Sequence, residues 1–325
     1  MNNDHTKLKV MVLAGGPDLE REVSLMSGAE VAKALEMAGH EVMVRDILPG
    51  DLRALDDFVA WGGDVIFPAM HGKWGEGGGL QVILENQGLR FVGSRALAAR
   101  LCMDKQQAKL VMDEAGIATP AFCVVKVGET VAFEEVGLVP GVIKPIDDGS
   151  SMDMAICHSA ADLDAARERL HETHERLMVE RYVKGRELTV SVVLNDADEE
   201  EALPVIEIVP AGEFYDYEAK YFRDDTQYLF DLGLSKALVE QIQTVAVRAH
   251  KLLGARHLSR VDFMLDECGK SWVLEINTLP GCTTHSLLPM AARQAGIEFS
   301  MLVDRLVRAV MTPPAERAGL VGSEV

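Results

Sequence analysis

The sequence predicts a mixed α/β (α+β) fold built from three successive units. Near the N-terminus, strand, loop, helix and strand follow one another in the order that produces a parallel sheet with covering helices. A second set of strands and charged helices begins at about Met103. The last third carries two apolar runs around a short turn, which is the pattern of an antiparallel hairpin.

The first unit alternates short apolar strands with loops and one clear helix. Its predicted strands are Lys9 to Ala14, Val42 to Ile47 and Asp64 to Pro68. Apolar residues from Val31 to Ala38 keep helical spacing, and Gly39 ends that helix. The stretch HGKWGEGGGL (71–80) is too rich in glycine for a helix, so we expect a loop after the third strand. Ligands of open α/β sheets bind at such strand ends.

The second and third units continue the alternation of strands and helices. In the second unit, the predicted strands are Val142 to Pro145, Met154 to Cys157 and Leu177 to Val183, and the predicted helices are Lys105 to Ala115 and Asp162 to Arg176. The third unit begins near Glu187 with the strand LTVSVVL and closes with a helix from Phe299 to Met311. We expect four parts: 1–102, 103–187, 188–312 and a loose tail, 313–325.

The hairpin SRVDFMLDECGKSWVLEINTLPG (259–281) carries polar residues inside its strands. A turn at Cys268-Gly269 places Asp262 opposite Glu275 and Arg260 opposite Asn277. Because side chains alternate between faces, these four polar groups share one side of the hairpin. The opposite, core face is predicted to consist of Val261, Phe263, Leu265, Trp272, Leu274 and Ile276.

Two facing carboxylates repel each other and favour a cation between them. Oxygen ligands without His or Cys suit a hard ion, and Mg²⁺ characteristically takes one or two carboxylates together with substrate phosphates. The hairpin therefore indicates a metal–phosphate site. Charged strand faces are also ordinary in antiparallel sheets, so a solvated face with Arg260 neutralising the acids fits the same residues.

The segment GEFYDYEAKYFRDDTQY (212–228) has no clear period and holds four of the five tyrosines. A long loop of this kind in a compact domain is usually functional and often forms a lid. A surface loop pinned by its aromatic side chains is the alternative.

Composition excludes several classes of protein. The chain has 325 residues, 48% of them hydrophobic and 26% charged, as in a globular domain protein. The net charge of −19 argues against nucleic acid and anionic membranes as partners. No apolar run approaches a membrane span or a secretory signal. The five scattered cysteines are expected to be buried thiols of a reducing cytoplasm.

Eight short blocks together resemble the D-alanine–D-alanine ligase family, which has the ATP-grasp fold. The blocks are EREVSL (20–25), HGKWGE (71–76), MDK (103–105), KPIDDGSS (144–151), FYDYEAKY (214–221), RVD (260–262), EIN (275–277) and PGCTTHS (280–286). Each block is weak alone, but their order along nearly the whole chain is that of the family. The resemblance implies three α/β domains, with a pre-ATP-grasp N-terminal domain and ATP held between the central and C-terminal domains.

The resemblance also implies a reaction and a set of roles. The carboxylate of a first D-alanine would attack the γ-phosphate of ATP, and the amine of a second D-alanine would displace phosphate from the resulting acyl phosphate. Cytoplasmic peptidoglycan precursor synthesis and a homodimer are implied too. The implied site residues are Glu20, Ser150, Tyr221, Arg260 and Gly281 in catalysis; Lys105, Lys144, Ser151, Glu180, Glu187 and Lys220 at ATP; Asp262, Glu275 and Asn277 at Mg²⁺ or Mn²⁺ (two ions); and His71, Ser286 and Leu287 at the substrates.

Several of these residues have plain alternatives. Lys105 and Lys144 would by themselves be surface lysines, and Glu20 could match the charge of a helix N-terminus. His171 and His174 are one helical turn apart, but without further ligands they are expected on a solvated helix face and not at zinc.

The chain departs from the family where Asp153 replaces a usual glycine of the central phosphate loop. We expect weaker ATP binding or an altered loop there. Trp74 and Gly77 also differ from the residues that are most common in the family's motif around His71. The alternatives within the enzyme class are ligases that add D-serine or D-lactate, although Tyr221 favours an amine nucleophile. A non-catalytic nucleotide-binding protein is the alternative outside it.

Overall fold

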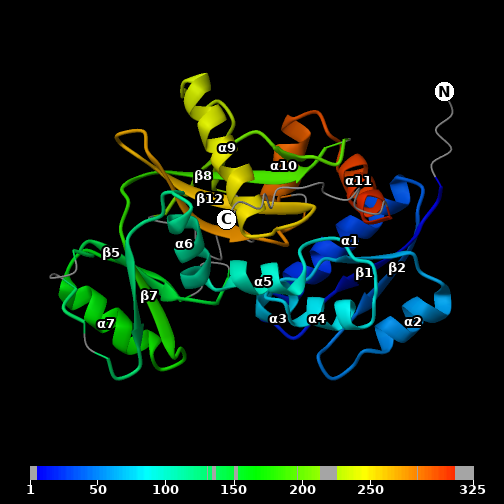
Figure 1. Cartoon of the computed structure of the whole chain (residues 1–325), viewed down its shortest axis with the longest axis horizontal. Coiled ribbons are helices and arrows are strands. Elements are labelled where there is room, and N and C mark those ends of the chain that lie inside the picture. Colours follow the sequence, from blue (N-terminus) through cyan, green and yellow to red (C-terminus); the bar gives the residue numbers. More distant parts are fainter. Residues whose placement is uncertain are drawn as a thin grey trace, which may run out of the picture.

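The computed structural model describes residues 6–129, 131–133, 137–149, 153–195, 197–212, 225–283 and 285–311. Within these residues the chain forms three sheets that follow one another along the sequence. Figure 1 shows the first sheet and its helices at one end of the molecule and the small central sheet with α7 at the other. The largest sheet lies above and between them (Figure 1).

The first sheet is parallel, with strand order β2-β1-β3, as the sequence predicts. Its strands are β1 (Lys9–Ala14), β2 (Glu41–Asp46) and β3 (Val65–Pro68). The helices of this unit are α1 (Arg21–Met37), α2 (Arg53–Trp61), α3 (Gly72–Glu76), α4 (Gly79–Asn86) and α5 (Ala96–Met103). Gly39 follows α1 with a φ of 92°, which is the left-handed conformation expected where a helix ends.

The loop expected over residues 71–80 is wrong, because the segment forms α3 and the start of α4. Two carboxylates, one distant in the sequence and one within the helix, satisfy the first amides of α3. The Asp18 carboxylate accepts hydrogen bonds from the backbone N–H groups of Trp74 and Gly75, and the Glu76 carboxylate accepts one from Gly72. These tertiary caps offset the poor helix propensity of the glycines.

The central sheet is antiparallel, with order β4-β7-β5-β6. Its elements are α6 (Lys105–Glu114), β4 (Phe122–Lys126), β5 (Gly141–Pro145), β6 (Ala155–Cys157), α7 (Ala160–Leu170) and β7 (Arg176–Arg181). The prediction that the second helix reaches Arg176 is wrong. It begins with a Ser159–Asp162 capping box and ends at Leu170, after which a turn leads into β7.

The largest sheet has the order β11-β10-β8-β12-β13, with β9 pairing with β8. Its strands are β8 (Gly185–Leu194), β9 (Glu200–Ala202), β10 (Ile206–Val209), β11 (Gln227–Leu229), β12 (Leu258–Asp266) and β13 (Ser271–Asn277), and its helices are α9 (Lys236–Leu252), α10 (Leu287–Gln294) and α11 (Phe299–Met311). The predicted hairpin is β12–β13. Arg260 lies opposite Asn277 and Asp262 opposite Glu275, as the sequence predicts.

A β-bulge changes the register closer to the turn, where Phe263 pairs with Val273. Val273 is therefore fully buried, whereas Leu274 lines a cavity beside Glu275. Trp272 is only partly buried and stacks under the Arg181 guanidinium at 4.8 Å. The assignment of Trp272 and Leu274 to the core face is wrong, because the extra residue of the bulge shifts the alternation of side chains.

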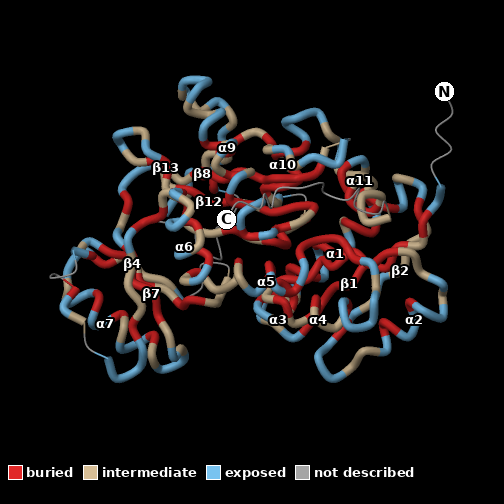
Figure 2. Tube along the Cα trace, viewed as in Figure 1, coloured by how far each residue is buried: buried red, intermediate tan, exposed pale blue. Residues whose placement is uncertain are grey.

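The apolar cores join distant parts of the chain (Figure 2). One cluster combines strands of the first sheet with α11 and α10, so the last helices pack on the first unit. Three cysteines are buried, but Cys268 is exposed and Cys123 is partly buried, which corrects the expectation that all five are buried. No helix within the described residues combines the length and apolarity that crossing a membrane requires.

Candidate functional site

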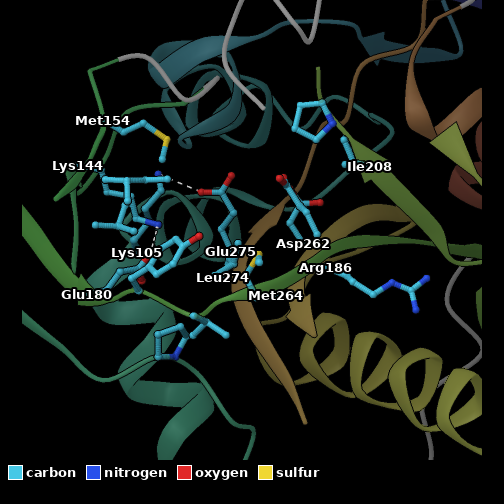
Figure 3. Close-up of a pocket in the computed structure, with 18 of the residues that line it drawn as sticks. Lys105, Lys144, Met154, Glu180, Arg186, Ile208, Asp262, Met264, Leu274 and Glu275 are labelled. Carbon is cyan, nitrogen blue, oxygen red and sulfur yellow. Dashed lines mark hydrogen bonds and ion pairs between the residues drawn. The ribbon is translucent and has the colours of Figure 1, made fainter. Parts of the chain in front are cut away.

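A cavity of about 360 Å³ lies between the central sheet and the largest sheet. Strand ends, the loop after β5 and the β7–β8 connection form its walls. It brings together eight of the residues singled out from the sequence: Lys105, Lys144, Glu180, Glu187, Arg260, Asp262, Glu275 and Leu287. Figure 3 shows Asp262 and Glu275 pointing the same way into this space, with Lys105, Lys144 and Glu180 to one side of them.

Asp262 is held in one orientation by two neighbours. The Arg260 guanidinium donates from Nε and Nη2 to its two carboxylate oxygens at 2.9 and 2.8 Å. The buried Thr189 hydroxyl on β8 donates to Oδ1 at 2.6 Å. Bidentate pairs of this kind fix geometry as well as charge. The arginine therefore neutralises one acid of the facing pair.

Glu275, the other acid, lies 3.4 Å from the Lys105 ammonium. Lys105 opens α6, is buried, and also donates to the backbone oxygen of Asp148 at 2.5 Å. It thus joins α6 and the loop after β5 to Glu275 on β13. The surface-lysine alternative for Lys105 is wrong.

Glu180 lies between two lysines. Its Oε1 accepts from Lys144 at 2.5 Å, and its Oε2 lies 3.0 Å from the ammonium of Lys109 on α6. Burial favours the neutral acid, but the two ammonium groups outweigh it and the pKa of Glu180 is lowered. Burial also disfavours the charged form of Lys144, yet Glu180, Glu275 and Glu187 together raise its pKa. Lys144 is therefore a charged lysine in a low-dielectric wall of the cavity.

The first unit contributes Glu20 and His71 next to this cavity. Glu20 is buried before α1, and a Cβ atom at Gly149 of the central loop would lie 3.2 Å from its Oε1. His71 is also buried; its Nδ1 lies 3.2 Å from Glu76 and its Nε2 lies 3.0 Å from the Ser27 hydroxyl. Ser27 Oγ in turn accepts the Cys282 backbone N–H, so this chain of contacts reaches the loop that carries Gly281.

Three predicted residues, Asn277, Gly281 and Ser286, lie between the end of β13 and the start of α10. Asn277 ends β13, and its Oδ1 accepts from the Leu279 backbone N–H at 3.0 Å. Ser286 precedes α10, and its hydroxyl accepts from the Thr283 N–H. A Cβ at Gly281 would lie 2.8 Å from Ser286 Oγ, so this loop approaches Ser286 too closely for a larger residue to fit without movement. None of these three lines the 360 Å³ cavity.

Four predicted residues, Ser150, Ser151, Lys220 and Tyr221, lie outside the described residues, as does most of the expected lid. Asp153, in the loop between β5 and β6, has a φ of 52°, the conformation that glycine adopts most easily. His174 binds this region: its Nε2 lies 2.7 Å from Asp148 and 3.7 Å from Asp153. The expectation of a solvated His174 is wrong, because α7 ends early and the turn after it carries the imidazole to the loop.

Lys109 and Thr189, which orient Glu180 and Asp262, are not among the residues predicted from the sequence. Lys109 had a recognisable signal, since it follows Lys105 by one helical turn beside the apolar Ala108 and Met112. A lysine there is buried with its helix face and needs a partner. Thr189 had no such signal, because threonine is ordinary in strands.

The donor set fits a hard divalent cation. Asp262, Glu275 and Asn277 present oxygen atoms on adjacent strands, with carboxylates facing across the pair. Among the described residues no three acidic, histidine or cysteine side chains gather as a complete metal site. Two carboxylates and an amide suit an ion such as Mg²⁺, which completes its coordination with phosphate and water.

Known proteins with similar sequences are ligases that act on D-alanine. Residues 111–308 match the family model described as D-ala D-ala ligase C-terminus. The chain is 42% identical over 303 residues to a D-alanine–D-alanine ligase of Marinobacter nauticus, covering 92% of this chain and 90% of that one. It is also 42% identical over 301 residues to one of Dechloromonas aromatica, covering 92% and 96%.

Solved structures agree with these sequence matches. A D-alanine–D-alanine ligase of Bacillus anthracis complexed with ATP matches with a TM-score of 0.79 and 30% identity, covering 94% of this chain and 97% of that one. The VanG D-Ala:D-Ser ligase of Enterococcus faecalis matches with a TM-score of 0.80 and 29% identity, covering 94% and 100%. The chain belongs to the D-alanine–D-alanine ligase family, with its ATP-grasp fold.

Proposed function

We propose that this protein joins two molecules of D-alanine into D-alanyl-D-alanine, with ATP converted to ADP and phosphate. The observation that carries the proposal is the single cavity in which Lys105 and Lys144 lie beside the facing carboxylates of Asp262 and Glu275. Cations for phosphate and oxygen ligands for a divalent ion are the two requirements of phosphoryl transfer. Family membership supports the choice of substrates.

ATP would occupy the cavity with its phosphates toward Lys105 and Lys144. Glu180 and Glu187 line the wall near the β7–β8 connection, where adenine and ribose would bind. Ser151 and Lys220 are proposed as further phosphate contacts. Met154, Met264 and Leu274 supply apolar surface on which a base can pack.

Asp262, Glu275 and Asn277 would hold Mg²⁺ or Mn²⁺, and we propose two ions. When bound, such ions neutralise charge that develops on the transferred phosphoryl group. The residues around them have separate tasks. Arg260 and Thr189 keep the Asp262 carboxylate oriented, and the Lys105 ammonium balances the charge of Glu275.

The reaction needs two displacements. A carboxylate oxygen of the first D-alanine bonds to the γ-phosphorus while the bond to the ADP oxygen breaks. The nitrogen of the second D-alanine then attacks the acyl carbon, loses a proton, and expels phosphate together with that carboxylate oxygen. Arg260 and the Gly281 N–H would stabilise the oxyanion of this second step.

The first domain would position the first D-alanine. Glu20 would pair with its ammonium group, Ser150 and Tyr221 would hold Glu20, and His71 would contact the substrate. Ser286 and Leu287 would contact the carboxylate and methyl group of the second D-alanine.

We also propose peptidoglycan precursor synthesis in the cytoplasm, a homodimer, and domains at 1–102, 103–187 and 188–312 with a tail at 313–325. Family membership supports the pathway, and exposed Leu25 and Met26 on α1 are compatible with a dimer contact. Sedimentation of the purified protein tests the dimer.

The structural match to a D-Ala:D-Ser ligase keeps D-serine as a second candidate for the attacking amine. Coupled ADP release, with D-alanine, D-serine and D-lactate compared side by side at neutral pH, decides between them. We expect turnover to be fastest with D-alanine alone and to require Mg²⁺. Absence of phosphate release at saturating ATP and D-alanine would contradict the proposal and favour a non-catalytic nucleotide-binding protein.

A further inference from the structure

Lys109 is the most deeply buried charged side chain next to the proposed nucleotide site. Its side chain has 0% exposure, and its ammonium contacts strands β7 and β13 and the loop after α6. It donates to the Thr119 hydroxyl at 2.6 Å, lies 3.0 Å from Glu180 Oε2 and approaches the Val273 backbone oxygen at 3.5 Å. Lys109 is not among the residues that line the cavity, so it contacts no ligand there.

Burying an ammonium group carries a large desolvation penalty unless its partners compensate. Burial indeed lowers the pKa of Lys109, with Glu180 acting in the opposite direction and Lys144 adding to the lowering. A methionine would fill the same space without this penalty. Among the polar contacts that a methionine cannot make, the one that reaches the nucleotide site is the contact with Glu180, the carboxylate that also binds Lys144.

The geometry around Glu180 makes this contact important for Lys144. Each oxygen of the carboxylate is bound to a different lysine, which fixes the rotation of the carboxylate group. The two lysines also share its charge, so Lys144 is held less tightly than it would be in an isolated buried pair. Without Lys109, the Glu180 carboxylate would be free to rotate and would bind Lys144 alone. The carboxylate would then compete with a phosphate of the nucleotide for the Lys144 ammonium.

Lys109 also connects the two walls of the cavity, because it contacts both the central sheet and the largest sheet. It lies one helical turn beyond Lys105 on α6, and its contact with Val273 is two residues from Glu275 on β13. Lys105 itself contacts Glu275. Through this pair of lysines, α6 joins Glu180 of the central sheet to the acid pair of the largest sheet.

We propose that Lys109 is a positioning residue for nucleotide binding, which acts by fixing the Glu180 carboxylate and, through it, the Lys144 ammonium. The proposal rests on the proposed ATP site. It predicts that loss of Lys109 weakens ATP binding without a matching effect on the amino-acid substrates.

The test compares Lys109→Met with Met112→Ala. Met112 is fully buried on the same helix and contacts the apolar core, so its truncation is a control for loss of stability alone. Binding of a non-hydrolysable ATP analogue is measured by calorimetry, and the KM values for ATP and D-alanine are measured by ADP release. For Lys109→Met we expect the dissociation constant and KM for ATP to rise about tenfold to a hundredfold, the effect typical of losing a group that orients a binding residue.

A thermodynamic cycle with Glu180→Gln identifies the route of the effect. Because Lys109 is proposed to act through Glu180, Lys109→Met should change ATP binding less than threefold in the Glu180→Gln background. Independent, additive effects in the cycle would overturn the proposal. So would equal losses of ATP affinity in Lys109→Met and Met112→Ala at matched melting temperatures.

If Lys109→Met does not fold, Thr119→Val is the second variant, because it removes the hydroxyl that orients the ammonium. A rise of at least twofold in the dissociation constant for the ATP analogue supports the proposal, and an unchanged constant overturns it. The binding measurement also separates this proposal from the proposed ligase activity. A protein that binds the analogue but never releases ADP refutes the activity and leaves the role of Lys109 measurable, whereas a wild-type protein without analogue binding refutes both.

Discussion

The Asp153→Gly substitution is predicted to tighten ATP binding with little change in stability. Asp153 has a φ of 52°, which lies in the left-handed region that glycine adopts most easily. Replacing it with glycine removes a strain of roughly 1 kcal/mol. Glycine loses more backbone entropy on folding, which costs about 0.5–1 kcal/mol.

The ion pair with His174 contributes little to this balance. The Asp153 carboxylate is half exposed and lies 3.7 Å from the imidazole, whereas Asp148 lies closer, at 2.7 Å. An exposed pair of this kind contributes about 0–1 kcal/mol. The opposing effects therefore leave the free energy of unfolding within about 1 kcal/mol of the wild type.

The effect on ATP comes from charge and from backbone freedom. One negative charge leaves the loop that would bind phosphate, an electrostatic change of about 0.2–1 kcal/mol at a solvated position. This corresponds to a dissociation constant up to about fivefold lower. Calorimetric ATP binding and the KM for ATP measure the change directly.

Asp153→Asn is the matched control, because asparagine tolerates the left-handed conformation but carries no charge. If charge dominates, both variants bind ATP more tightly. If backbone freedom dominates, only the glycine variant does. An unchanged dissociation constant and KM for ATP in both variants would refute the reasoning.

Three further predictions follow from the ion pairs. Asp262→Asn should abolish Mg²⁺-dependent ADP release while folding is retained, and turnover above about one per cent of wild type would contradict this metal site. Glu180→Gln leaves the buried Lys109 ammonium without its carboxylate partner, so urea unfolding should show a loss of about 3–5 kcal/mol, and a loss below 1 kcal/mol would count against the pairing. Burial lowers the pKa of His40 from 6.5 despite the contact with Asp304. The stability that neutral His40 contributes is therefore present above pH 6.5 and is lost as the pH falls below it. In denaturation curves between pH 7.5 and 5, His40→Gln should reduce the dependence of the unfolding free energy on pH.

The structure confirms the predicted pairs of Asp262 with Glu275 and Arg260 with Asn277. Closer to the turn the predicted register is wrong by one residue, since Leu265 lies opposite Ser271, and the bulge offsets this difference before the acid pair. The bulge that moves Leu274 to the cavity side could not be predicted, because it depends on how the hairpin packs against neighbouring elements.

Other misses have a similar origin in tertiary contacts. The helix α3 depends on capping by Asp18, which lies more than fifty residues earlier in the chain. His174 reaches the central loop only because α7 ends at Leu170. Lys109 could have been found, since a lysine within an apolar helix stripe requires a buried partner. Its partner Glu180 is distant in sequence, so the pairing itself required the structure.

The proposed ligase activity requires that the carboxylate of D-alanine is phosphorylated in the cavity bounded by the lysines and the acid pair. The most direct test is turnover of D-alanine labelled with ¹⁸O in its carboxylate, followed by mass spectrometry of the released phosphate. We predict one labelled oxygen in each phosphate formed with the dipeptide. Dipeptide formation with unlabelled phosphate would contradict the claim.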